Sequence, residues 1–229
     1  MALRIGFDMD GVLADFSSAY LQVEERLFGR VRVKARAEDP EVEAGKQEEQ
    51  DEGRERRGDS SRRRDAIWKA IQATPDFWAT LKPLDPDAVR RIHAMALQHR
   101  WEVFFITQRP YTEGAVVQRQ TQRWLVEQGF DLPSVLVIAG SRGAAAGALR
   151  LDYHVDDSPR NCIDVKSESG AKPLLIIEPD DDATMATARR LGIGTATSIR
   201  ECLDILDQAS QARKSPKLLH RLAQMVGWH

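Results

Sequence analysis

Two aspartates, Asp8 and Asp10, stand one residue apart directly after a short apolar run near the start of the chain. Carboxylates this close repel each other unless a positive charge lies between them, and Mg²⁺ is a hard cation that prefers oxygen ligands. With a metal ion bound, one carboxylate oxygen is free to act as a nucleophile. Gly11 lets the chain turn sharply after these acids. The alternative is a turn without chemistry, since Asp and Gly are common turn residues.

Polar residues follow two further apolar runs in the same way. Thr107 ends one such run, and Asp156 and Asp157 end another. In an open α/β sheet, ligands bind at the carboxyl ends of the strands. Because parallel strands point their carboxyl ends the same way, we expect these side chains to converge with the first two aspartates at one edge of the sheet.

The elements that position these residues alternate between strands and helices. The apolar run at 3–7 has no helical period, which is typical of a buried strand in a parallel sheet. Later apolar runs predict four more strands, at 103–106, 135–138, 153–155 and 174–177. Periodicity and capping signals predict helices that start near Leu13, Asp65, Asp85, Thr112, Gly143, Asp182 and Ser198. For the helix from Thr112, the predicted inner face comprises Val116, Val117, Trp124 and Leu125. The alternation predicts an α/β fold, a three-layer, Rossmann-like parallel sheet.

The segment from Lys34 to Arg64 differs from the rest of the chain. It has no aromatic and almost no large apolar residues, and its acidic and basic residues nearly balance. Such a segment cannot bury enough apolar surface to offset its ordering entropy. We expect a solvated loop or an exposed, salt-bridged helix that is partly mobile. A nucleic-acid patch is the less favoured alternative, because the acids beside the arginines neutralise it.

The string DMDGVLADF, which runs from Asp8 to Phe16, resembles the first motif of the haloacid-dehalogenase-like (HAD) phosphatases, in particular their 5′(3′)-deoxyribonucleotidase branch. The resemblance implies that Asp8 is the nucleophile that forms an aspartyl-phosphate and that Asp10 is the general acid and then the general base. It implies a Mg²⁺ site formed by Asp8, the backbone carbonyl of Asp10, Asp156 and Asp157, the last binding through water or orienting the site. Thr107 would donate a hydrogen bond to a phosphoryl oxygen.

The resemblance also implies a division of the chain. The catalytic core would comprise residues 1–16 and 83–210, and a small helical cap inserted after the first strand would comprise residues 17–82, including the charged segment at 34–64. Residues 211–229 are expected to form an amphipathic helix that packs on its own domain or on a second subunit, so that a homodimer is one alternative.

Two positions depart from the family pattern. Members usually carry a lysine before the fourth motif, and this chain has Arg142 there. Arginine keeps the charge but presents a longer, differently shaped fork, and we expect it to take the catalytic role of the lysine. The alternatives are that Arg142 is a surface residue while Lys166 or Lys172 reaches the site, or that catalysis is lost. Gln108 stands where the nucleotidases have a small hydroxyl residue, which changes how a nucleotide would be oriented.

Substrate selection is expected to lie in the cap. Phe16 matches an aromatic residue of the deoxyribonucleotidases, and Trp68, Phe77 and Trp78 fall in the segment from which those enzymes draw their base-stacking pocket. Aromatic faces stack on any base. The alternative is that these rings form the cap's own core. Arg109 is a further candidate for substrate binding. It would pair with a phosphate or with a surface acid, and a structural role near the site is the favoured alternative.

The bulk composition limits the classes of function. A net charge of −2 over 229 residues gives no overall field that favours nucleic-acid polymers or acidic membranes. No apolar run approaches membrane-spanning length, and the two cysteines lack metal-ligand spacing. With no signal peptide at the N-terminus, these features favour a cytoplasmic protein that acts on a small phosphoester.

The sequence therefore predicts a Mg²⁺-dependent phosphatase for a nucleoside monophosphate. One alternative is a phosphatase for another small phosphoester, such as a sugar phosphate or a nucleic-acid end. Another is a protein that binds a phosphate or a nucleotide without catalysis. His154 is expected to be a hydrogen-bonded structural histidine rather than a metal ligand.

Overall fold

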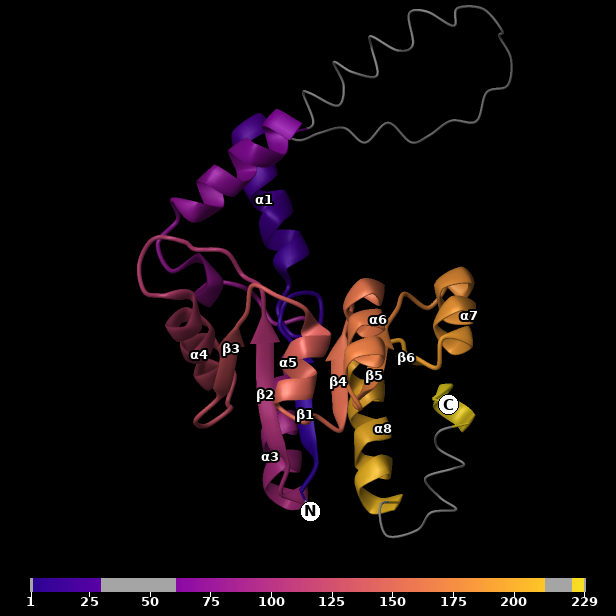
Figure 1. The fold of residues 1–229 in the computed structure, drawn as a ribbon. Helices are drawn as coiled ribbons and strands as arrows, with labels where there is room; N and C mark the ends of the chain where they lie inside the picture. Colours follow the sequence, from indigo (N-terminus) through magenta and orange to yellow (C-terminus); the bar gives the residue numbers. More distant parts are fainter. Residues whose placement is uncertain (1, 30–60, 213–223, 229) are drawn as a thin grey trace, which may run out of the picture.

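A single parallel sheet carries the chain's architecture in the computed structural model, which describes residues 2–29, 61–212 and 224–228 (Figure 1). Its strands lie in the order β3-β2-β1-β4-β5-β6, and all neighbouring pairs are parallel. The strands are β1 (Arg4–Asp8), β2 (Glu102–Thr107), β3 (Ser134–Val137), β4 (Tyr153–Asp156), β5 (Lys172–Ile176) and β6 (Gly194–Ala196). The predicted α/β class and the five predicted strands are confirmed. The strand β6 was not predicted, because Gly-Thr-Ala contains no apolar run.

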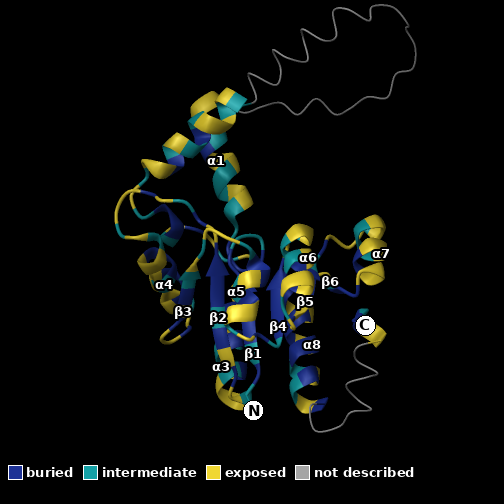
Figure 2. Ribbon diagram, in the orientation of Figure 1, coloured by how far each residue is buried: buried dark blue, intermediate teal, exposed yellow. Residues whose placement is uncertain are grey.

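The chain also contains helices, most of which cover the two faces of this sheet. They are α1 (Phe16–Phe28), a helix over 61–72, a 3₁₀ turn η1 (Phe77–Ala79), α3 (Ala88–His99), α4 (Val117–Glu127), α5 (Arg142–Ala148), α6 (Pro159–Glu168), α7 (Asp182–Arg190) and α8 (Ile199–Ala212). The helices α5 and α6 pack closely together on one face, and α3 packs against α8 on the other. Figure 2 shows the strands buried between these layers, with the outer faces of the helices exposed. The three-layer prediction is therefore correct.

The helix that follows β2 starts later than predicted. It begins at Val117 rather than at Thr112, and Val116 is 69% exposed instead of lying on the inner face. Hydrogen bonds to the preceding part of the chain hold the intervening loop outside the helix. The backbone N–H of Asp76 donates to Glu113 O at 2.7 Å, and Ala115 N donates to Asp76 Oδ1 at 2.8 Å. These tertiary contacts outweigh the local start signal.

The helix α1 and the helix over 61–72, together called the helical arm, extend away from the carboxyl edge of the sheet (Figure 1). The arm buries Val23 on α1 and Ile67 and Ile71 on the second helix. Residues 34–60 of the charged segment lie outside the described residues. The described remainder, 61–64, is helical, and Arg63 lies 3.5 Å from Glu24 of α1. For these residues, the exposed, salt-bridged helix is therefore the correct alternative.

The end of the chain returns to the sheet. Residues 213–223 of the predicted C-terminal helix lie outside the described residues, while 224–226 form a short helical turn. Val226 and Trp228 are buried, and the Trp228 indole N–H donates to Pro173 O at 2.8 Å. The described part of the tail thus packs on its own domain. Within the described residues, no helix combines the length and the apolar character needed to cross a membrane.

Candidate active site

The register of the central strands brings the predicted acids and Thr107 to one edge of the sheet. Asp8 pairs with Ile106 across β1 and β2, so that Thr107 lies one residue beyond it. Phe7 pairs with Val155 across β1 and β4, which places Asp156 next to Asp8. Asp8, Thr107 and Asp156 are all buried. The predicted placement at one edge of the sheet is therefore present for these three residues.

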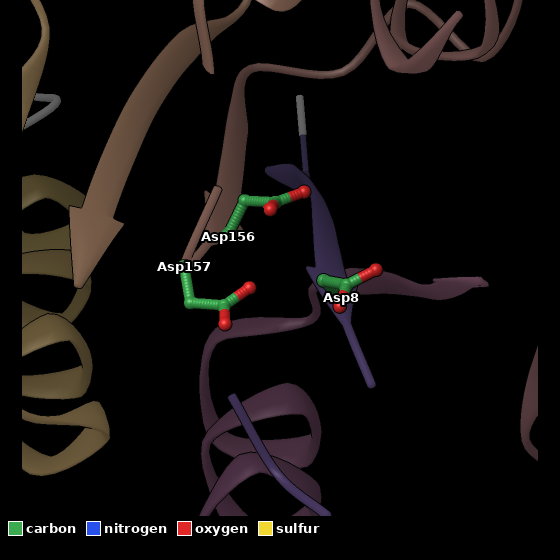
Figure 3. Close-up of side chains that lie close together, drawn as sticks. All are labelled: Asp8, Asp156 and Asp157. Carbon is green, nitrogen blue, oxygen red and sulfur yellow. The ribbon is translucent and has the colours of Figure 1, made fainter. Parts of the chain in front are cut away.

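Asp8, Asp156 and Asp157 form the carboxylate cluster. One oxygen from each side chain lies within 4.8 Å of the others, and Figure 3 shows Asp156 and Asp157 extending from the end of β4 toward Asp8. Gly11 allows this approach. Its φ is 82°, and a Cβ at this position would lie 1.9 Å from Asp157 Oδ2. Any side chain here would displace the loop or the aspartate.

The cluster has more negative charge than its surroundings neutralise. Burial, reinforced by the charge of Asp156, raises the pKa of Asp8 well above its usual range, although Arg142 acts in the opposite direction. Partial desolvation and the Asp156 charge raise the pKa of Asp157 to about 6. Three converging carboxylates, two of which have pKa values raised by burial and by mutual repulsion, are a donor set suited to a hard divalent cation such as Mg²⁺.

Asp156 is the most firmly held member of the cluster. Its carboxylate is 3.0 Å from His154 Nε2, and it accepts hydrogen bonds from Ser158 N at 2.9 Å and from the Asn161 amide at 3.1 and 3.2 Å. Burial acts to raise the pKa of Asp156, but the hydrogen bond to His154 and the other partners outweigh it and lower the pKa. His154 is the hydrogen-bonded structural histidine that was predicted.

Sequence reasoning did not identify the other two partners of Asp156. The available signal was the N-terminus of α6, where Ser158 precedes Pro159 at the first helical position. The first turn of such a helix returns toward the strand that precedes it. Asn161 lies in this turn, three residues after the cap, and its amide therefore reaches back to Asp156.

Arg142 lies inside the site rather than on the surface. It is 4% exposed, and its Nη2 donates to Asp8 Oδ1, while its Nε lies 3.6 Å from Asp156 Oδ2. Its Nε and Nη1 have no hydrogen-bond partner among the described residues. Ser141 caps α5 by accepting hydrogen bonds from Gly143 N and Ala144 N, which fixes the start of the helix.

The two lysines considered as replacements for Arg142 have other contacts. Lys166 Nζ donates to Gly192 O at 3.3 Å, and Lys172 lies 5.5 Å from the centre of the Trp228 ring. Neither contact is with the carboxylate cluster. Arg142 is therefore the cation that the described structure places against Asp8.

Asp10 is half-buried and turns away from the cluster toward Arg109. Arg109 Nη2 donates to Asp10 Oδ1 at 2.7 Å, and Nε donates to Oδ2 at 2.9 Å. The Arg109 side chain is 0% exposed. Of the two alternatives for Arg109, this geometry agrees with a structural role near the site, because its guanidinium is covered and paired with an acid of the site rather than free to bind a phosphate.

The aromatic residues proposed for base stacking divide into two groups. Phe77 and Trp78 are 4% and 1% exposed, so they offer no free face and belong to the core between the arm and the sheet. Phe16 and Trp68 are only partly buried and stack with ring centroids 5.6 Å apart. Gln108 is exposed, and its side-chain amide donates to Gly140 O at 2.6 Å. The stacking prediction therefore fails for Phe77 and Trp78 and stays open for Phe16 and Trp68.

A groove of about 510 Å³ opens beside the carboxylate cluster. It runs between the start of α1 and the start of α7, and its lining includes Gly11, Phe16, Asp157, Ile176 and Thr184. Because Asp157 and Phe16 both border it, a molecule held at the cluster has room to extend along this groove.

The chain was compared with known protein families, with curated protein sequences and with solved structures. A family model described as 5′ nucleotidase, deoxy (Pyrimidine), cytosolic type C protein matches residues 2–189. Comparison with curated protein sequences finds no match.

Two solved structures share the fold. A HAD family hydrolase from Deinococcus radiodurans R1, with bound phosphate and sodium, has a TM-score of 0.53 at 14% identity, covering 100% of this chain and 99% of its own. A haloacid-dehalogenase-like hydrolase from Streptococcus pneumoniae has a TM-score of 0.50 at 12% identity, covering 90% and 98%. At these identities, the likeness shows the fold alone.

Proposed function

Because the chain belongs to the cytosolic type C deoxy (pyrimidine) 5′-nucleotidase family, we propose that it is a Mg²⁺-dependent phosphatase that hydrolyses a nucleoside monophosphate through an aspartyl-phosphate on Asp8. The observation that carries this proposal is the position of Asp8. It is buried at the end of β1, within reach of Asp156 and Asp157 and in contact with the partly unpaired guanidinium of Arg142.

The first chemical step is the transfer of the phosphoryl group to Asp8. A carboxylate oxygen of Asp8 forms a bond to phosphorus while the bond from phosphorus to the leaving sugar oxygen breaks. Asp10 gives its proton to that oxygen, so that a neutral alcohol leaves. In the second step, Asp10 takes a proton from water as the water attacks phosphorus, which releases inorganic phosphate and restores Asp8.

Arg142 and Thr107 support this transfer. The Nε and Nη1 groups of Arg142 are buried donors without partners among the described residues, and a phosphoryl group beside Asp8 would satisfy them. Thr107 ends the neighbouring strand, and its hydroxyl would donate to another phosphoryl oxygen. Donors fixed before the reaction stabilise charge in the transition state without reorganisation.

Asp8, Asp156, Asp157 and the backbone carbonyl of Asp10 would hold Mg²⁺. When bound, the ion offsets the negative charge of the carboxylates and of the phosphoryl oxygens. The Asp10 side chain is left out of this set, in agreement with its pairing to Arg109. His154 and Asn161 hold Asp156 in its position in the site.

The groove beside the cluster has room for a substrate whose leaving alcohol is larger than methanol or ethanol. Phe16 at its border is the aromatic residue available for a base. The burial of Phe77 and Trp78 favours a second candidate, a phosphatase for a smaller phosphoester such as a sugar phosphate, because it reduces the stacking surface. The proposed compartment is the cytoplasm, in keeping with two buried cysteines that form no disulfide.

The test is phosphate release by the purified full chain, with Mg²⁺ or with a chelator, from deoxy- and ribonucleoside monophosphates, sugar phosphates and an aryl phosphate. The expected result is Mg²⁺-dependent turnover that is fastest with nucleotides. Turnover of sugar phosphates alone would select the second candidate. A folded protein that releases phosphate from none of these esters would contradict the proposed function.

A further inference from the structure

The pairing between Asp10 and Arg109 differs from an ordinary surface salt bridge. Arg109 Nε lies 3.2 Å from Asp10 Oδ1 and 2.9 Å from Oδ2, and Nη2 donates to Oδ1 at 2.7 Å. The guanidinium therefore meets the carboxylate edge to edge, a geometry that fixes orientation as well as distance. The Arg109 side chain is 0% exposed, whereas that of Asp10 is 24% exposed. The acid remains accessible while the group that holds it does not.

The remaining faces of Arg109 are also occupied. Its Nη1 donates to Thr121 Oγ1 at 2.9 Å, and Thr121 in turn donates to Val117 O within α4. The guanidinium carbon lies 4.9 Å from the centre of the Trp78 ring, which is a cation–π distance. Each of the three nitrogens of Arg109 thus has a partner among the described residues.

Trp78 and α4 are themselves firmly held. The indole N–H of Trp78 donates to Pro110 O at 2.9 Å, and its backbone N–H donates to Gln120 Oε1 at 3.0 Å. Gln120 and Thr121 are both buried polar residues of α4. The buried polar face of α4 therefore fixes the loop after β2 on which Arg109 stands.

We propose that Arg109 is a positioning residue that holds the Asp10 carboxylate in the orientation for proton transfer, and that Thr121 and Trp78 fix Arg109 for this purpose. The inference rests on the proposed function, in which Asp10 is the general acid and base. Asp10 Oδ1 accepts two hydrogen bonds from Arg109 and Oδ2 accepts one. The less occupied oxygen, Oδ2, is the one left to carry the transferred proton.

The decisive experiment compares two esters that differ in their need for an acid. A nucleoside monophosphate releases an alcohol that must be protonated, whereas 2,4-dinitrophenyl phosphate releases an anion that needs no proton. Arg109→Lys keeps the positive charge but loses the bidentate contact with the Asp10 carboxylate. We expect its kcat with the nucleotide to fall about 100-fold. With the dinitrophenyl ester, we expect a stopped-flow burst of one equivalent at the wild-type rate, followed by slow turnover because Asp10 no longer activates water well.

Two further variants complete the design. Thr121→Val removes the second partner of Arg109 without contacting Asp10, and the same pattern is expected with a loss of about 10-fold. If circular dichroism shows that Arg109→Lys does not fold, Thr121→Val takes its place as the test of the inference. Arg91→Lys is the matched control, because Arg91 is a partly exposed arginine paired with Asp204 on a helix away from the site. We expect its kinetics with both esters to equal those of the wild type.

The outcomes separate the inference from the proposed function. Equal losses with both esters and no burst, or a raised KM with unchanged kcat, would overturn the role of Arg109 while the wild type remains active. A wild-type protein that turns over neither ester would overturn the proposed function, and the inference with it.

Discussion

The carboxyl edge of the sheet and the helical arm are built in different ways. At the sheet edge, three of the four acids have fixed partners: Arg142 for Asp8, Arg109 for Asp10, and His154 with Asn161 for Asp156. In the arm, the aromatic rings pack mainly on one another, with Phe16 in contact with Tyr20, Trp68, Phe77 and Trp78. In the proposed function, the residues at the strand ends carry out the chemistry, whereas substrate choice depends on Phe16 and Trp68, which are only partly buried.

The largest effect that this comparison predicts is at Asp8. Asp8→Asn keeps the size of the side chain but removes the nucleophile, and we expect kcat with any phosphoester to fall by at least about 10⁴-fold. Phosphate release measures the loss, and circular dichroism checks that the fold is retained. Asp131→Asn is the control, since Asp131 is exposed and far from the cluster in the fold. Turnover above a tenth of the wild-type rate would remove Asp8 from its role.

Substitutions of Arg142 test whether the site at the sheet edge needs the positive charge that this residue places against Asp8. Arg142→Met keeps much of the length but leaves Asp8 without its ion-pair partner, and we expect kcat/KM to fall by about 10²–10³-fold. Arg142→Lys should restore activity to within about tenfold of the wild type, because the charge is kept. Arg119→Met, which changes an exposed arginine of α4, should have no effect. An Arg142→Met variant with wild-type kinetics would show that the guanidinium does not bind the phosphoryl group.

The pH dependence of the free energy of unfolding tests whether the carboxylates at the sheet edge carry excess negative charge. An acid whose pKa is higher in the folded protein than in the unfolded chain binds its proton more tightly when folded. With the pKa of Asp157 at about 6 and that of Asp8 also raised, the metal-free protein should become more stable as the pH falls from 7 toward 5. Aspartates with lowered pKa values, such as Asp76 and Asp85, lose their stabilising effect only at more acidic pH.

Thermal unfolding in the presence of a chelator measures this dependence. Saturating Mg²⁺ should remove or reverse it, because the ion binds the ionised carboxylates and stabilises the folded state. Asp157→Asn should flatten the metal-free profile in the same window. A Tm that falls between pH 7 and pH 5 without metal would show that the cluster does not carry excess negative charge.

The smallest expected effect lies in the arm. Phe16→Leu removes a stacking face at the border of the groove, and we expect KM for nucleoside monophosphates to rise about 5- to 10-fold with little change in kcat. An aryl phosphate too small to reach the arm should be unaffected. Phe28→Leu provides the control on the same helix, where Phe28 is 42% exposed. An equal change in KM for both esters would indicate that Phe16 supports the fold rather than the substrate.

The sheet edge was largely predictable from the sequence. Asp8, Thr107 and Asp156 each end a buried apolar run, and parallel strands necessarily align such ends. Arg142 was assigned from the family resemblance, because it stands at the position of the usual lysine, and in the structure it begins α5 after the Ser141 cap. Local patterns of this kind are sufficient where the side chain follows directly from a strand or a helix end.

The contacts that were not predicted depend on tertiary packing. Arg109 and Asp10 are 99 residues apart in the chain, and either could have paired with solvent or substrate. Gln120 and Thr121 have the polar character of an exposed helix face, yet both are buried against the loop that precedes α4. The rings of Phe77 and Trp78 carry no sequence signal that separates a core position from a binding position.

The most direct test of Asp8 as the nucleophile is intact-protein mass spectrometry of the enzyme, quenched in acid during turnover of a nucleoside monophosphate with Mg²⁺. We expect a covalent phosphoryl adduct that peptide mapping places on Asp8 and that is absent from Asp8→Asn. An active wild-type protein that shows no adduct, or an adduct on another residue, would contradict this role of Asp8.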